Sequence, residues 1–410
     1  MRFSFRRLAP ILLTLSLSGA AAGGAERHTT VDAFVVYSEA ARLLNNHYAG
    51  PDMLGIGPLL DREGAALKRA CAGTIPCPET LGRAAVEHVI HALHDGHTSV
   101  HWDVDLEQAR APVYVKRSGM LTLPTPEGDL QVVHVDDTSE AERASVHPGD
   151  VVLAVIGLPP AASAAALTRQ IRAAEDSGQP FKVRLRRTGL EQTVTLKGRM
   201  GLWGPVPSLR WEGKVAVISL PILKAGTGIR FANLVTQAQA LGATGLVVDV
   251  RLNPGGTIPD LLVAAEALNA NTSTFSSVAR SGRVTEDWTR VSEQGAPPER
   301  YVFTRWNKPL VILTSSQTAS AGEILTYLAR RAGAQVIGEA TYGIMNTASS
   351  THALPGGSTL NLTSTRTVGS SGQWIPARVV PDQLVPLTAG DRAAGRDAQL
   401  QAALRWVALQ

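Results

Sequence analysis

The sequence predicts a mixed α/β protein built from segments that differ in secondary structure. Residues 30–95 carry apolar residues at helical spacing, and residues 111–198 read as short strands separated by turns. After residue 200 the chain alternates buried strands with helices, which is typical of a sheet with parallel pairing. A length of 410 residues suits two or three domains.

The first residues, MRFSFRRLAPILLTLSLSGAAAGGAE, have the composition of a secretory signal peptide. Arg2, Arg6 and Arg7 form a basic start. The apolar run Leu8–Leu17 follows, and it is too short to span a membrane. We therefore expect residues 1–25 to direct export to the periplasm or the medium. No later run of about 18 apolar residues occurs, so we expect no membrane span.

Charge and cysteine content argue against a nucleic-acid-binding protein and against a zinc site. The formal net charge of +4 comes mostly from the arginines of the leader, so the mature chain has no basic surplus for nucleic acid. The cysteines are Cys71 and Cys77, and in an exported protein this spacing favours one local disulfide. A zinc site is disfavoured, because zinc takes three or four protein ligands.

The N-terminal segment is expected to contain helices over residues 30–48, 52–73 and 77–96. Thr30 is a candidate N-cap for the first of them. In the last, Pro78 is typical of a helix start and Gly96 of a helix end.

The middle segment is expected to form a compact β-rich domain of about ninety residues. Strands are predicted within residues 112–135 and 147–160, followed by a helix over 163–178 and a hairpin over 181–198.

The remaining segment is expected to form the α/β core. Strands are predicted over residues 214–222, 244–253, 309–316 and 334–339, and helices over 228–243, 258–269 and 321–333.

Several motifs resemble, in the same order, those of the C-terminal processing peptidase and tricorn-core superfamily of serine peptidases. They are LHDGHTSV (93–100), the PDZ-type stretch SEAERASVHPGDVVLAVIGLPP (139–160), LVVDVRLNPGG (246–256), TASAGEI (318–324), VIGEATYG (336–343) and SGQWIPARVVPDQLV (371–385). The resemblance implies a crotonase-like spiral α/β peptidase core over residues 200–410. It further implies a PDZ-like domain over 109–199 and an N-terminal helical segment over 26–108 that carries the candidate base.

Ser320 stands just before a predicted helix, where peptide N–H groups point at the side chain and favour a developing oxyanion. The resemblance makes Ser320 the nucleophile. It places the oxyanion hole at Gly255 or Gly256 together with Ala321. The purely structural alternatives are that Ser320 only caps the helix and that the two glycines only form a tight turn.

The general base is the main departure from the processing-peptidase pattern. There a lysine follows the Tyr-Gly turn, but here Ile344 takes that position, and Lys308 is the last lysine in the chain. The tricorn-like branch uses a histidine, and the match falls on His97. A neutral imidazole accepts a serine proton near pH 7 without a shifted pKa.

The group that orients His97 is left open by the sequence. Gly96 stands where the tricorn pattern has a serine, and no acid precedes Asp382 in the terminal motif. Asp95, Gln373, Thr98 or Glu339 could substitute.

Neighbouring residues have structural interpretations. Glu323 fits a capping box with Ser320, and Arg251 is expected to support the turn after the second core strand. Histidines recur at residues 88, 91, 94, 97 and 101, which raises a metal-site interpretation, but no HExxH pattern occurs and we expect no metal.

The expectation is therefore an exported serine endopeptidase that needs no cofactor and acts on peptides or unfolded protein segments. Its oligomeric state is left open. The alternatives are a weak or inactive relative that binds peptides or apolar ligands through the same cleft, and a PDZ-type scaffold.

Overall fold

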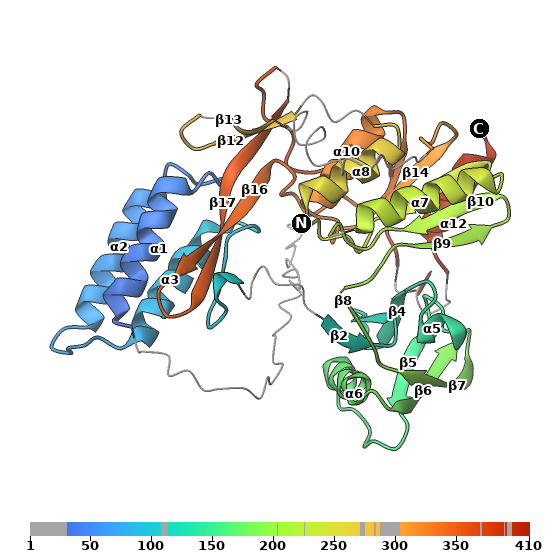
Figure 1. Cartoon of the computed structure of the whole chain (residues 1–410), viewed down its shortest axis with the longest axis horizontal. Helices are drawn as coiled ribbons and strands as arrows, with labels where there is room; N and C mark the ends of the chain where they lie inside the picture. The colour runs from blue at the N-terminus through green and yellow to red at the C-terminus, as the bar shows by residue number, and fades with distance from the viewer. Residues whose placement is uncertain are drawn as a thin grey trace, which may run out of the picture.

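A computed structural model describes residues 31–107, 114–202, 204–224, 226–270, 275–282, 284–287, 304–369, 371–388, 390–391 and 396–410. The predicted leader and the candidate cap Thr30 lie outside the described residues. In Figure 1 the N-terminal helices lie at one end of the molecule, along the long strands β16 and β17. The main sheet and its helices lie at the other end, and the β-rich segment lies beside that sheet. No helix of the described part is long and apolar enough to cross a membrane.

The N-terminal segment forms the predicted helices. Asp32 caps the first helix by accepting a hydrogen bond from the Phe34 amide, in place of Thr30. The third helix ends before Gly96, because His94 takes a left-handed conformation with φ of 47°. The bounds are α1 (Ala33–His47), α2 (Ile56–Ala70) and α3 (Glu79–Leu93).

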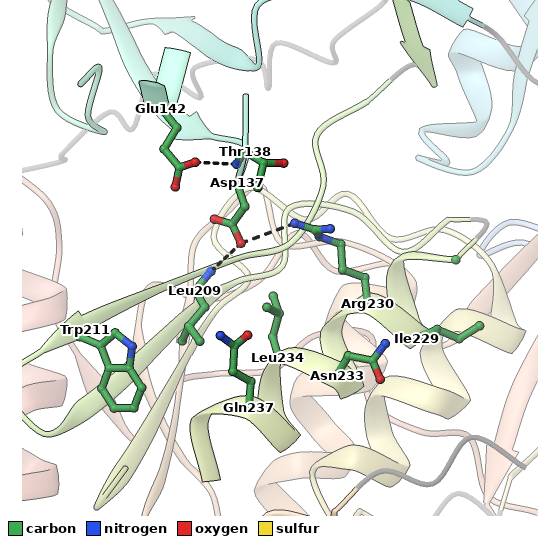
Figure 2. Close-up of a pocket in the computed structure, with 11 residues that line it drawn as sticks. Asp137, Thr138, Glu142, Leu209, Trp211, Ile229, Arg230, Asn233, Leu234 and Gln237 are labelled. Atoms are coloured by element: carbon green, nitrogen blue, oxygen red, sulfur yellow. Dashed lines mark hydrogen bonds and ion pairs between the residues drawn. The ribbon is translucent and has the colours of Figure 1, made fainter. Parts of the chain in front are cut away.

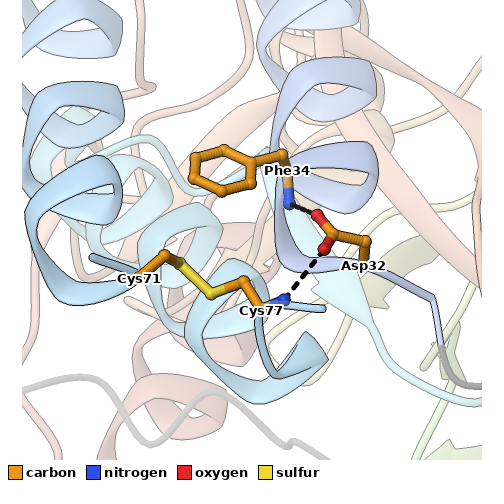
Figure 3. The surroundings of a disulfide bond; sticks show 4 residues. All are labelled: Asp32, Phe34, Cys71 and Cys77. Atoms are coloured by element: carbon orange, nitrogen blue, oxygen red, sulfur yellow. Dashed lines mark hydrogen bonds between the residues drawn. A yellow bond between two sulfur atoms is a disulfide. The ribbon is translucent and has the colours of Figure 1, made fainter. Parts of the chain in front are cut away.

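A disulfide joins Cys71, at the end of α2, to Cys77, just before α3. Figure 3 shows it beside the start of α1, where Asp32 accepts a hydrogen bond of 2.9 Å from the Cys77 amide. The disulfide therefore closes the turn between two helices and adjoins the cap of a third.

Replacing both Cys71 and Cys77 by serine is expected to lower stability by about 2 kcal/mol, because the cross-link closes a short loop. Thermal unfolding followed by circular dichroism would measure the loss. An unchanged melting temperature would contradict the expected stabilisation. Reduction of the wild-type protein should reproduce the effect.

The middle segment contains a five-stranded sheet of order β3-β4-β5-β6-β7 and a two-stranded sheet, β2-β8. Helix α6 packs on this segment through Leu167 and Ile171. The bounds are β2 (Tyr114–Arg117), β3 (Met120–Pro124), β4 (Leu130–Val135), α5 (Glu140–Arg143), β5 (Val151–Val155), α6 (Ala164–Ser177), β6 (Pro180–Arg187), β7 (Leu190–Lys197) and β8 (Arg199–Leu202).

The core is a six-stranded sheet of order β18-β15-β14-β11-β10-β9, in which β10, β11, β14, β15 and β18 pair in parallel. The strands are β9 (Ser208–Glu212), β10 (Val215–Ser219), β11 (Gly245–Asp249), β14 (Leu310–Thr314), β15 (Gln335–Gly338) and β18 (Gln383–Leu384). The helices are α7 (Thr227–Ala240), α8 (Ile258–Ala267), α10 (Ala321–Arg331) and α12 (Ala398–Ala408).

Both faces of this sheet are covered, which explains the continuous apolar runs of its strands. Val248 and Ile312 pack in the cluster that includes α7, α8 and α10. Val247 and Val311 pack on the other face, against α12. The sequence predicted the first three helices but not α12.

A second sheet, also not predicted, connects the N-terminal helices to the core. Its order is β1-β17-β12-β13, with β16 paired to β17. Leu360 and Leu362 of β17 pack into the cluster of the N-terminal helices. The strands are β1 (Ser99–His101), β12 (Phe275–Ala279), β13 (Val284–Asp287), β16 (Thr347–Leu354) and β17 (Ser358–Gly369). Because β1 pairs with β17, the turn that carries His97 is held at the edge of this second sheet.

Candidate active site

Ser320 lies between strand β14 and helix α10, as the sequence predicted. Its backbone has φ of 51° and ψ of −122°, a conformation that non-glycine residues rarely adopt and that recurs at functional sites. The Ser320 amide donates a hydrogen bond of 2.9 Å to Oε2 of Glu323. This contact is one half of the predicted capping box, and it holds the backbone of the strained residue.

His97 lies in the turn between α3 and β1. Asp95 fixes this turn, since its carboxylate accepts from the His97 amide at 3.1 Å and from the Thr98 hydroxyl at 2.7 Å. Asn361 of β17 donates to the His97 carbonyl at 2.8 Å. The backbone of His97 is therefore anchored from both sides.

The His97 ring and the Ser320 hydroxyl are in hydrogen-bond contact across 223 residues of sequence. Nε2 of His97 lies 2.9 Å from Oγ of Ser320. This distance is within the range that a base needs to take a proton from a nucleophile.

The turn after β15 packs against the turn that carries His97. Ile344 stands in the position of the lysine, and its side chain faces Gly96: a Cβ at Gly96 would lie 3.2 Å from Ile344 Cγ2 and 2.7 Å from Tyr342 Cε1. A serine at residue 96 would therefore not fit without displacing these side chains. The two departures from the family patterns, Gly96 and Ile344, fit each other.

The orienting contact to His97 comes from Thr347, which sequence reasoning missed. Nδ1 of His97 lies 2.8 Å from Oγ1 of Thr347, the first residue of β16. Asp95 and Thr98, two of the sequence candidates, hold the turn and not the ring. No motif distinguishes Thr347 from other threonines, so only the contact identifies it.

The pKa of His97 is lowered by burial, and the nearby carboxylate of Asp95 opposes that effect in part. The ring is therefore neutral near pH 7. When Nδ1 carries the proton, Nε2 has a free lone pair that points at the Ser320 hydroxyl.

The glycine pair after β11 lies against Ser320. A Cβ at Gly255 would come within 2.7 Å of Ser320 Cβ, and a Cβ at Gly256 within 1.5 Å of the Leu223 carbonyl oxygen. Their φ values are 104° and 143°, which L-residues with side chains rarely adopt. Both positions therefore require glycine.

Of the two glycines predicted as oxyanion donors, Gly255 has an amide that is already engaged. Its amide already donates at 2.8 Å to Oδ1 of the fully buried Asn253. The amides of Gly256 and Ala321 make no hydrogen bond within the described part of the chain. These two amides are the ones open to a substrate carbonyl.

Glu323 is fully buried and its carboxylate connects Ser320 to the Ile344 turn. Besides the Ser320 amide, it accepts from the amides of Gly343 at 2.8 Å and Ile344 at 3.0 Å and from the hydroxyl of Thr341. Burial raises the pKa of Glu323, and these donors oppose the rise. Its contacts make it a scaffold for both turns.

Arg251 supports the chain just before the glycine pair, as predicted. Burial alone would lower its pKa, but the carboxylates of Asp249 and Asp397 outweigh that effect and hold the pKa above its ordinary value. Its guanidinium contacts Asp249 at 2.6 Å and Asp397, the cap of α12, at 2.8 Å. The helix that the sequence did not predict is thereby joined to the strand that precedes the glycine pair.

The β-rich segment has an edge strand, and a nearby backbone amide is already hydrogen-bonded to a side chain. Strand β3 is at the edge of its sheet, where a peptide could add as a further strand. Just before it, however, the Ser118 amide donates at 2.8 Å to the buried carboxylate of Glu175. The Glu175 carboxylate therefore occupies the amide next to this edge strand.

A hollow of about 630 Å³ lies away from the Ser–His pair, between α7, β9 and the loop after β4. In Figure 2 Arg230 of α7 points toward Asp137, which also accepts from the Leu209 amide at 3.3 Å. Neither Ser320 nor His97 lines this hollow. Among the described residues no cluster of three potential metal ligands occurs.

Comparison with known proteins decides the family of the core. Residues 214–385 match the model of Peptidase family S41. This region belongs to the S41 peptidases. The S41 region contains Ser320, the glycine pair and Ile344, but His97 lies outside the matched residues. The resemblance drawn from the sequence motifs is confirmed.

Curated relatives that match this chain are named as processing proteases. It is 24% identical over 316 residues to the carboxy-terminal processing protease CtpA of Bacillus subtilis, covering 75% of this chain and 64% of that protein. It is 30% identical over 231 residues to the carboxyl-terminal-processing protease of Picosynechococcus, covering 53% and 51%. The chain thus spans about half to just under two thirds of these relatives.

Solved structures support the fold. A candidate S41 protease of Bacteroides fragilis matches with a TM-score of 0.59 at 13% identity, covering 90% of this chain and 97% of that one. A candidate peptidase of Parabacteroides merdae matches with a TM-score of 0.51 at 14% identity, covering 92% and 97%. The predicted mixed α/β class is confirmed. The PDZ-like identity and the limits of the segments stay predictions.

Proposed function

We propose that this S41 chain is an exported serine endopeptidase that cleaves peptides or unfolded protein segments through an acyl-enzyme. The observation that carries the proposal is the 2.9 Å contact between His97 Nε2 and Ser320 Oγ. Relatives named as carboxy-terminal processing proteases support a peptide substrate. The leader-like first residues support export.

In the proposed reaction the Ser320 hydroxyl oxygen attacks the scissile carbonyl carbon while His97 Nε2 takes the hydroxyl proton. The carbonyl oxygen becomes an oxyanion that the Gly256 and Ala321 amides stabilise. The His97 imidazolium then gives its proton to the leaving amine, which departs with the C–N bond electrons. A water molecule, deprotonated by the same ring, hydrolyses the acyl-enzyme and frees Ser320.

Mass-spectrometric digestion of an unfolded protein and a peptide library tests this function. Wild type should produce new peptide ends that Ser320→Ala does not produce, and those ends give the cleavage preference. Equal digestion by both proteins would refute a Ser320 peptidase. Peptide capture without cleavage would favour the alternative of a binding relative.

The pH dependence follows from the lowered pKa of His97. Because the base acts in its neutral form, activity should rise with pH through the pKa of His97. Burial moves that rise below about pH 6.5, the ordinary value for histidine. Rates of a fluorogenic peptide between pH 4 and 9 would measure it. A midpoint above 6.5 would contradict the assigned base.

A further inference from the structure

We propose that the hydroxyl of Thr347 is the positioning group that orients His97, so that the site works as a Ser–His–Thr arrangement without a carboxylate on the ring. This inference rests on the proposed function. It starts from a chain of contacts: Ser320 Oγ to His97 Nε2 at 2.9 Å, and His97 Nδ1 to Thr347 Oγ1 at 2.8 Å.

The second hydrogen bond of the Thr347 hydroxyl indicates which ring nitrogen of His97 carries the proton. Oγ1 of Thr347 donates to the carbonyl oxygen of Ile344 at 3.2 Å. With its single proton on the Ile344 carbonyl, the hydroxyl oxygen accepts from Nδ1 of His97. Nδ1 must then carry the ring proton, which leaves Nε2 as the acceptor that faces Ser320.

Thr347 is held in place well enough to impose this tautomer. Its side chain is 5% exposed, so water competes little for the contact. Its backbone pairs with Arg366 of β17, and the Asn346 carbonyl before it accepts from the Thr367 amide at 2.9 Å. As a β-branched residue it also has few rotamers to choose from.

Within the described part of the chain, no carboxylate hydrogen-bonds the His97 ring, whose partners are Ser320 and Thr347. The Asp95 carboxylate is committed to the His97 amide and to the hydroxyls of Thr98 and Thr363. The Glu323 carboxylate accepts four hydrogen bonds, none of them from His97. A neutral hydroxyl fixes the ring but stabilises the imidazolium less than a carboxylate would, which agrees with the lowered pKa of His97.

The test compares Thr347→Val, Thr347→Ser and wild type. Two readouts are used: turnover of a fluorogenic peptide, and the rate at which a fluorophosphonate labels Ser320. Active-site titration by the same probe corrects for misfolded protein. Thr347→Val should lower kcat and the labelling rate about tenfold to 100-fold with little change in KM, since one hydrogen bond at the transition state is lost. Thr347→Ser should restore most of both rates.

The pH profile separates positioning from mere packing. The Thr347 oxygen accepts more strongly from imidazolium than from neutral imidazole, so its loss should lower the pKa of His97 further. The rising limb of the labelling rate in Thr347→Val should therefore move to lower pH. A matched control is Thr359→Val, because Thr359 is fully buried in the same sheet and its hydroxyl has no partner among the described residues. That variant should change neither rate.

Suppose that wild type is labelled and turns over the peptide. The positioning role would then be overturned if Thr347→Val stayed within twofold of wild type, or if Thr347→Ser were as impaired as Thr347→Val. In both cases the proposed function would stand. Labelling of Ser320 without peptide turnover would refute the proposed function, and the labelling rates would still decide the role of Thr347. If Ser320 resists the probe in wild type, both proposals fail.

Discussion

Replacing His97 by alanine is expected to lower kcat/KM by about 10³-fold or more, because Ser320 would lose the group that takes its proton. Ser320→Ala should cost at least as much. The double variant should be no worse than Ser320→Ala alone, since two residues that act as a unit do not contribute additively. Steady-state rates of a fluorogenic peptide, with active-site titration where the serine is present, would measure these losses.

A matched control is His91→Ala, because His91 is an exposed histidine of the neighbouring helix α3. It should retain full activity. Retained activity in His97→Ala would remove His97 as the base, and the search would turn to another group near Ser320. Additive losses in the double variant would argue against a Ser–His pair even if each single variant were impaired.

Replacing Gly256 by alanine is expected to lower kcat by about 10²-fold to 10³-fold, the usual loss when one oxyanion donor is removed. The new Cβ would lie 1.5 Å from the Leu223 carbonyl oxygen, so the backbone must shift. The φ of 143° adds strain for any residue with a Cβ. The Gly256 amide, which we propose as an oxyanion donor, would move with the backbone.

Gly149→Ala provides the control for backbone strain alone, because Gly149 also has a positive φ, of 99°, but open space around a new Cβ. It should lose some stability and keep kcat. The measurement is kcat per titrated Ser320, with melting temperatures for both variants. A Gly256→Ala protein that melts lower but keeps kcat would show that this glycine only shapes the turn.

The sequence determined the parts of the fold that depend on local patterns. The parallel strands were predictable because strands buried on both faces are apolar throughout, as in the run before Asp249. The turn at Ser320 was predictable because it joins such a strand to an amphipathic helix. Helix α12 and strands β16 and β17 were not predicted. The β16 and β17 runs, residues 347–354 and 358–369, are rich in serine and threonine and give a weak apolar pattern.

Some features of the candidate site were likewise predictable from the sequence, and others were found only in the structure. By itself the sequence placed Ser320 before a helix and excluded a lysine base at the usual position after the Tyr-Gly turn, since no lysine follows Lys308. The tertiary structure decided the contacts between distant segments. Strands β1 and β16 both pair with β17, so the turn that carries His97 and the start of β16 with Thr347 meet beside Ser320. Those choices depend on which groups meet in space, and the spacing of residues along a chain does not encode that.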